Sequence, residues 1–228
     1  TFGGGDFIAA ARGMGADAHT TITYANFLPN LQEGVRVNPS EINGVVSDAY
    51  LQGDGSVQFT LQFESAVSSY SNIFGYYEVA ANGTLGNVFV LFANTLNVAF
   101  DARTVDLATP AADVKLGFFL IQDGFSFYGG LSDDLSFRAP GTTTLATLDA
   151  GLPPTLFSDS RGALDSTTIF HSFSTLNPGD AFQVLSGTSE GGLDMWLGFE
   201  DLPVYSGDND FQDVVISIRT NADGLLNV

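Results

Sequence analysis

Apolar residues recur at every second position over much of the chain, which is the pattern of β-strands with one covered face. In residues 56–65, SVQFTLQFES, four apolar residues alternate with polar ones, and residues 213–220, DVVISIRT, follow the same rule. Two other segments, 87–94 (NVFVLFAN) and 115–124 (KLGFFLIQDG), are apolar on both faces. We therefore expect these two to be central strands that are covered on both sides.

Shorter apolar runs separated by turn dipeptides such as Asn82-Gly83 and Asp123-Gly124 predict further strands. These are expected at 20–27, 44–51, 74–79, 143–149, 167–173, 181–187 and 195–200. Only residues 6–15, DFIAAARGMG, have a pattern that suits a helix. Many short strands, frequent turns and 26 glycines predict an all-β fold, a jelly-roll-like β-sandwich of many short antiparallel strands.

The chain of 228 residues is long enough to bury a large core. We expect one sandwich domain over residues 21–228, preceded by a Gly/Ala-rich arm, residues 1–20. Residues 129–166 are expected to be a loop-rich, Asp-rich insertion. No run of about twenty apolar residues occurs, so no membrane insertion is expected.

Acidic residues outnumber basic ones by 26 to 7, and the net charge is −19. This charge disfavours nucleic acids and anionic membranes as partners and favours divalent cations or a high-salt habitat. An acidic surface that only maintains solubility is the simpler alternative. The absence of cysteine excludes disulfides and Cys-based zinc sites.

Five carboxylates lie close together near the C-terminus with no lysine or arginine among them. Two like charges about 4 Å apart cost about 1 kcal/mol even in water, so the cluster needs a counter-charge. Calcium prefers six to eight hard oxygen ligands, whereas magnesium keeps more waters and transition metals favour His or Cys. A solvated loop whose acids cap turns is the alternative. The predicted calcium ligands are Glu200, Asp201, Asp208, Asn209, Asp210 and Asp213.

The ending GFEDL…GDNDFQDVV resembles the closing signature of the bacterial domain of unknown function 4114 family. Segments 71–94, 115–124 and 169–184 resemble other parts of that family in the same order, so the resemblance spans about residues 64–219. It implies a secreted β-sandwich of large surface, adhesin-like and calcium-associated bacterial proteins, with no agreed enzymatic activity. The stretch LPVYSG departs from the family, which tends to be glycine-rich there.

Two residues invite other functions. His171 lies next to Ser172, but no nucleophile elbow accompanies it, so we expect a hydrogen-bonded structural histidine. Trp196 and Glu200 have the same strand parity, and together they could form a small sugar platform. A single tryptophan in a strand more commonly belongs to the core.

We therefore expect a non-enzymatic, calcium-binding β-sandwich module of a bacterial surface, matrix or adhesive protein, located outside the cell or at its surface. One alternative is a self-assembling subunit of an extracellular filament or surface layer, joined through the arm. Another is a carbohydrate-binding module that uses Trp196. The expected partner is calcium, with other copies of the chain or cell-surface glycans as further candidates.

Overall fold

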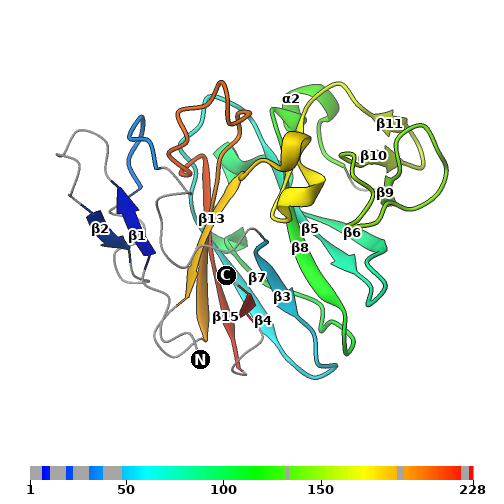
Figure 1. The fold of residues 1–228 in the computed structure, drawn as a ribbon, viewed down its shortest axis with the longest axis horizontal. Coiled ribbons are helices and arrows are strands. Elements are labelled where there is room, and N and C mark those ends of the chain that lie inside the picture. Colours follow the sequence, from blue (N-terminus) through cyan, green and yellow to red (C-terminus); the bar gives the residue numbers. More distant parts are fainter. Residues whose placement is uncertain are drawn as a thin grey trace.

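Two antiparallel sheets pack face to face in the computed structural model, which describes residues 7–10, 19–22, 31–37, 48–131, 134–188, 193–221 and 226–227 (Figure 1). The first sheet has the strand order β13 (Val184–Thr188), β14 (Asp194–Phe199), β15 (Val214–Thr220), β4 (Phe59–Ser65), β7 (Thr104–Asp106). The second has the order β16 (Leu226–Asn227), β3 (Tyr50–Gln52), β8 (Lys115–Ile121), β5 (Ile73–Val79), β6 (Leu85–Phe92), and β12 (Ile169–His171) also pairs with β8.

The chain passes repeatedly between these two sheets, from β4 to β5 and β6, then back to β7 and across again to β8. Such crossings are typical of jelly-roll sandwiches. All strand pairs are antiparallel, and the exposure of β4 alternates along the strand as its sequence predicts. The prediction of an all-β sandwich is confirmed.

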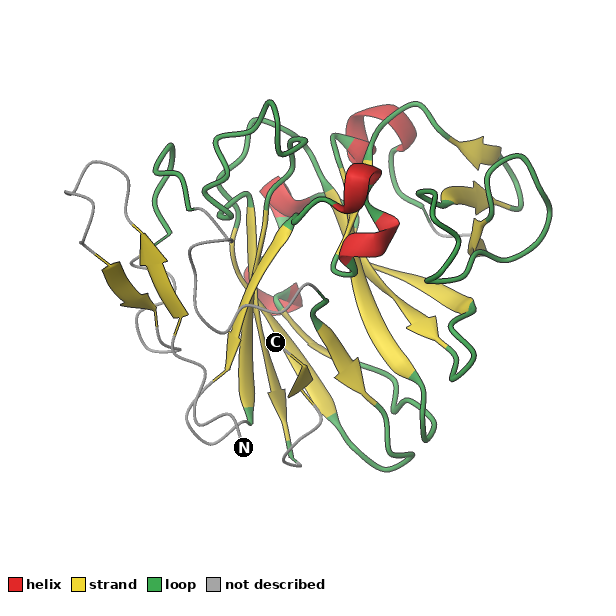
Figure 2. Ribbon diagram, viewed as in Figure 1, coloured by secondary structure: helices red, strands yellow, loops and turns green. Residues whose placement is uncertain are grey.

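Smaller elements surround the sandwich (Figure 2). A three-stranded sheet is formed by β9 (Leu135–Arg138), β10 (Thr155–Ser158) and β11 (Gly162–Leu164), and β1 (Phe7–Ala10) pairs with β2 (His19–Ile22). The described helices are short: α2 (Gly124–Tyr128) and the 3₁₀ turns η3 (Thr95–Asn97), η4 (Phe100–Ala102), η5 (Ser174–Leu176) and η6 (Pro178–Asp180). Within the described residues, no helix combines the length and apolar character needed to cross a membrane.

Strand β8 explains why a segment can be apolar on both faces. Leu116, Phe118 and Leu120 pack into the core between the two large sheets. Phe119 and Ile121 point to the opposite side, into a second core that includes Phe137, Leu156 and Leu164 of the three-stranded sheet. The central position predicted for this segment is therefore confirmed for β8, because both of its faces are covered.

Several local predictions were wrong. Residues 87–94 do not form a central strand: β6 lies at the edge of its sheet, where Phe89 is 37% exposed. Phe7–Ala10 form a strand rather than part of a helix, because they pair with His19–Ile22. Residues 143–149 make only isolated bridges, at Leu145 and Thr147. Strand pairing, which a local pattern does not encode, decided each of these.

The insertion at 129–166 is loop-rich, as expected, and its three short strands also contribute to the core. Phe137 is completely buried and packs edge-on against Tyr77 and Phe119 of the large sheet. We predict that Phe137→Ala lowers the free energy of unfolding by about 3–5 kcal/mol. Phe100→Ala, at a side chain that is 90% exposed, is the control and should cost much less. Denaturant unfolding measures both, and equal costs would contradict the prediction.

Candidate metal centre

The predicted carboxylates belong to the loop between β14 and β15. This loop lies at one end of the sandwich (Figure 1). The end of β4, the start of β5 and the end of β8 lie at the same end, because the strands are antiparallel neighbours. The upstream segment 31–37 lies against this loop, and the Val37 N–H donates to the Asn209 carbonyl over 2.8 Å. The site is thus assembled from segments that are far apart in the sequence.

The loop crosses the outer face of β14. Met195, Leu197 and Phe199 point into the core, so Gly198 faces outward. A Cβ atom at Gly198 would lie 2.3 Å from the carbonyl oxygen of Phe211, so only glycine lets the loop pass this close. This covering leaves Glu200 fully buried at the end of the strand.

The Glu200 carboxylate is the unusual group of the site. Its side chain is 0% exposed, yet neither Oε1 nor Oε2 has a hydrogen-bond partner among the described residues. The nearby Leu202 N–H lowers the pKa of this carboxyl, but burial and the neighbouring charges raise the pKa by more. The Leu202 N–H makes no hydrogen bond to either oxygen. Buried polar groups are nearly always hydrogen-bonded, and an isolated buried charge is very unfavourable. A proton or a cation would satisfy this carboxylate.

The main chain of Glu200 is fixed although its side chain is not. The Gln183 carbonyl accepts from the Glu200 N–H over 3.0 Å, and Gln183 Nε2 donates to the Glu200 carbonyl over 3.2 Å. The carboxylate is therefore held at the end of β14 by contacts that leave both of its oxygens unpaired.

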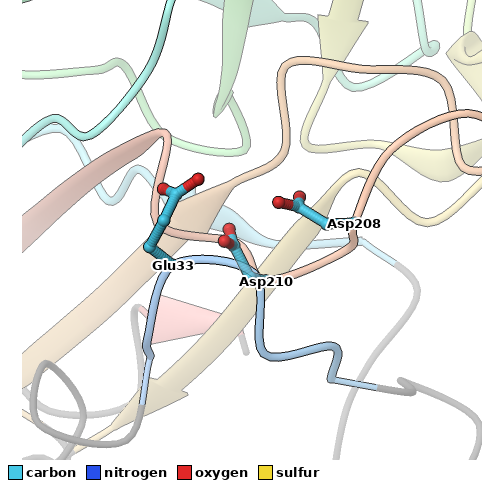
Figure 3. Close-up of side chains that lie close together, drawn as sticks. All are labelled: Glu33, Asp208 and Asp210. Carbon is cyan, nitrogen blue, oxygen red and sulfur yellow. The ribbon is translucent and has the colours of Figure 1, made fainter.

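Two groups of carboxylates surround this position. Glu200, Asp210 and Asp213 each offer an oxygen within 4.8 Å of the others, and Glu33, Asp208 and Asp210 form a second such group. Figure 3 shows the side chains of the second group directed toward one another from two segments of the chain. Asp210 belongs to both groups, so the two groups form one continuous carboxylate cluster.

Backbone amides hold Asp210 at the centre of the cluster. Its Oδ2 accepts from the Gly34 N–H over 2.8 Å, and its Oδ1 accepts from the Gln212 N–H over 3.1 Å. Each carboxylate oxygen has a second acceptor position, which stays available to a cation.

No cationic side chain of the protein neutralises the cluster within the described residues. The ion pairs found there join Arg138 to Asp159 and Arg219 to Asp194, and neither involves a cluster carboxylate. The guanidinium of Arg36 donates to the carbonyl of Val204 over 3.4 Å. Within the described part of the chain, the negative charges therefore face one another without a counter-charge.

The loop conformation provides one more neutral oxygen atom that could be a metal ligand. Asn209 and Phe211 both have positive φ, 57° and 58°, which the completely buried ring of Phe211 helps to maintain. The Asn209 amide nitrogen donates to the carbonyls of Val204 and Gly207, over 3.3 and 3.0 Å. Its Oδ1 is buried without a partner among the described residues, so it is available to bind a cation.

Asp201, which was also predicted as a ligand, forms a network of hydrogen bonds. Its Oδ2 accepts from Ser68 Oγ over 2.5 Å and from Asn72 Nδ2 over 2.6 Å, and its carbonyl accepts from Gln122 Nε2 over 2.8 Å. Its N–H donates to Asp213 Oδ2 over 2.8 Å. Asp201 thus joins the end of one sheet to the other and orients Asp213, and it lies outside both carboxylate groups.

The pKa values of the buried acids are raised. Burial, followed by the charges of Asp208, Asp210 and Asp201, raises the pKa of Glu200 to about 7. Burial, together with the charges of Asp201, Glu200 and Asp210, raises the pKa of Asp213 strongly. Burial is also the main cause of the raised pKa of Asp210. Without a cation, Glu200, Asp210 and Asp213 hold protons more tightly than free carboxyl groups do.

Of the residues predicted from the sequence, the structure brings Glu200, Asp210 and Asp213 together and places Asp208 beside Asp210. Glu33 was not predicted. It lies outside the C-terminal acidic stretch, and no local pattern marks it as a ligand, since only the path of segment 31–37 brings it to the loop.

The residues considered for other functions are buried. His171 is 1% exposed and packs edge-on against Tyr77 and Phe137, and burial lowers its pKa to about 3. Its backbone N–H donates to Asn177 Oδ1, whereas its ring Nδ1 has no hydrogen-bond partner among the described residues. Trp196 is 8% exposed, which leaves little ring surface for stacking against a sugar.

The raised pKa of Glu200 predicts that the cation-free protein loses stability as the pH rises. A carboxyl group whose pKa is higher in the folded than in the unfolded state stabilises the fold below its unfolded pKa, near 4.5, and this stability is lost as the pH passes through about 7. In a chelator, we expect the free energy of unfolding to fall by about 2 kcal/mol between about pH 5 and pH 8.

Glu200→Gln should make this fall shallower, and Glu78→Gln, on β5 of the other sheet, should leave it unchanged. Denaturant unfolding at a series of pH values measures the slope. A wild-type slope in Glu200→Gln would show that another group causes the pH dependence.

The contact between Gly207 and Glu200 gives a further prediction. A Cβ atom at Gly207 would lie 2.3 Å from Glu200 Oε1, so Gly207→Ala should displace the carboxylate and weaken cation binding about tenfold or more. Gly130→Ala is the matched control, since no atom lies within 4 Å of its added Cβ. Calorimetric titration with calcium measures both affinities, and equal affinities would count against this arrangement of ligands.

Comparison with known proteins identifies one family. Residues 111–221 match the family described as Domain of unknown function (DUF4114). The match includes β8 and the whole loop between β14 and β15, whereas residues 64–110 of the expected resemblance and the segment that carries Glu33 lie outside it. No curated protein and no solved structure matches the chain. By its segment 111–221, with the carboxylate loop included, this chain resembles the DUF4114 family.

Proposed function

We propose that this chain is a calcium-binding β-sandwich module that acts outside the cell or at its surface, within a bacterial surface, matrix or adhesive protein. The observation that carries the proposal is the fully buried Glu200 carboxylate, which has no hydrogen-bond donor among the described residues and shares its site with Asp210 and Asp213. A divalent cation is the counter-charge that satisfies all three groups at once.

The chemistry of the available donors favours calcium. The carboxylates and the side-chain Oδ1 of Asn209 are all hard oxygen atoms, the kind of ligand that calcium prefers. Magnesium typically uses fewer carboxylates and keeps several waters. Transition metals favour imidazole or thiolate, and the chain has no cysteine, while His171 is buried in the second core beside Phe137.

Burial supports a structural role for the cation rather than a catalytic one. Glu200 and Asp210 are 0% and 1% exposed, so a substrate has little access to a cation held by these two groups. Cation binding would instead neutralise the loop and stabilise it on the outer face of β14. Since the unfolded chain does not preserve the cluster, the binding energy would contribute to folding stability.

The filament and carbohydrate alternatives remain predictions with less support. The arm contributes strand β1, which already pairs within the chain with β2. The low exposure of Trp196 makes a sugar platform less favourable. Light scattering during the calcium titration tests self-assembly, because growth in mass upon binding would favour the filament alternative.

Calcium should raise the melting temperature of the EDTA-treated protein. At a calcium concentration of about 100 times Kd, binding adds about 2.7 kcal/mol, which for a domain of this size corresponds to roughly 5–10 °C. Glu200→Gln should abolish most of this increase. At about pH 8 without calcium, the same variant should melt higher than the wild type, because it removes a buried charge and breaks no hydrogen bond of the described residues.

Differential scanning calorimetry in calcium and in EDTA measures both effects, with Glu78→Gln as the control. A wild-type protein that neither binds nor is stabilised by millimolar calcium would refute the proposal. A Glu200→Gln variant with the full calcium response would place the cation elsewhere.

A further inference from the structure

Segment 31–37 packs on the carboxylate loop although it lies far upstream in the sequence. The Gly34 N–H donates to Asp210 Oδ2 and the Val37 N–H donates to the Asn209 carbonyl, both over 2.8 Å. Leu31 and Val37 are each 5% exposed, and Leu31 Cδ1 lies 3.0 Å from the position of a Cβ at Gly198. We call residues 31–37 the strap, because they cover both the loop and the outer face of β14.

The strap also brings a negative charge to a negative loop. Glu33 offers an oxygen within 4.8 Å of oxygens from Asp208 and Asp210. Its Oε2 accepts from Gln212 Nε2 over 2.9 Å, which holds the carboxylate toward the loop. Three like charges at this separation oppose the docking of the strap, whereas a cation between them favours it.

Asp210 belongs both to the carboxylate group that contains Glu33 and to the buried group that contains Glu200. It is 1% exposed, it shares a ligand group with the unpartnered Glu200 carboxylate, and it accepts the hydrogen bond from the strap. A cation held by Glu200, Asp210 and Asp213 would lower the negative potential that the strap meets. A cation bound to the buried group and the docked strap would therefore both contact the side chain of Asp210.

We propose that Glu33 is a further cation ligand, supplied from outside the family-like segment, and that divalent cation binding fastens the strap onto the carboxylate loop. The inference rests on the calcium site proposed above. It makes the site bipartite: the loop between β14 and β15 supplies the buried ligands, and the strap supplies the outer one. Calcium then controls how firmly the strap is attached to the sandwich.

Hydrogen exchange of two amides tests this directly. The amides of Gly34 and Val37 donate to the loop, so their exchange rates report docking of the strap. Calcium should slow both by about tenfold or more relative to EDTA. In Glu33→Gln, the amides should exchange more slowly than in the wild type in EDTA, because one repelling charge is gone, and calcium should then add little protection. The calcium affinity of this variant should fall about tenfold.

The side-chain amide that Glu33→Gln introduces can still accept the hydrogen bond from Gln212, so a purely structural role for Glu33 would not slow exchange in EDTA. Glu78→Gln is the matched control and should behave as the wild type. If the wild type binds calcium in calorimetry but the two amides exchange equally in calcium and EDTA, strap fastening is overturned while the calcium site stands. Unchanged affinity and unchanged calcium protection in Glu33→Gln would overturn the role of Glu33. Absence of calcium binding by the wild type would overturn both proposals.

Discussion

A carboxylate removed from water must be satisfied by a hydrogen-bond donor, a proton or a cation. The Glu200 carboxylate has no donor among the described residues, and the charges of Asp208, Asp210 and Asp201 oppose its ionisation. The protein thus folds around a group that the described part of the chain does not satisfy. Either a proton or a cation would relieve this unfavourable charge at the end of the sandwich.

The burial of Glu200 follows from the path of the loop that joins β14 to β15. The loop after β14 returns across the outer face of Gly198 and leads into β15, which pairs with β14. Asp201 ties the start of this loop to Ser68 and Asn72, which precede β5 of the other sheet. The loop is therefore anchored to both sheets, and its carboxylates are held close together despite their repulsion.

The sequence predicted strands best where the spacing of apolar residues alone sets which faces of a strand are buried. Alternation of apolar residues identified β4 and β15, and the doubly apolar segment 115–121 identified a strand covered on both faces. The same reasoning failed at 87–94, where apolar residues lie on an edge strand. The local pattern records how many apolar residues a segment has, but not which other segments are available to cover them.

The sequence by itself determined the all-β class, the acidic character of the C-terminal loop and the oxygen-only set of candidate ligands, because strand periodicity, charge and residue type are local properties. Only the tertiary structure decided how the acids divide their roles. It buried Glu200 without a partner among the described residues, assigned Asp201 to a hydrogen-bond network and brought Glu33 next to Asp208 and Asp210. Those outcomes depend on which strand ends and loops meet in space, and the distance between two carboxylates in the fold is independent of their separation along the chain.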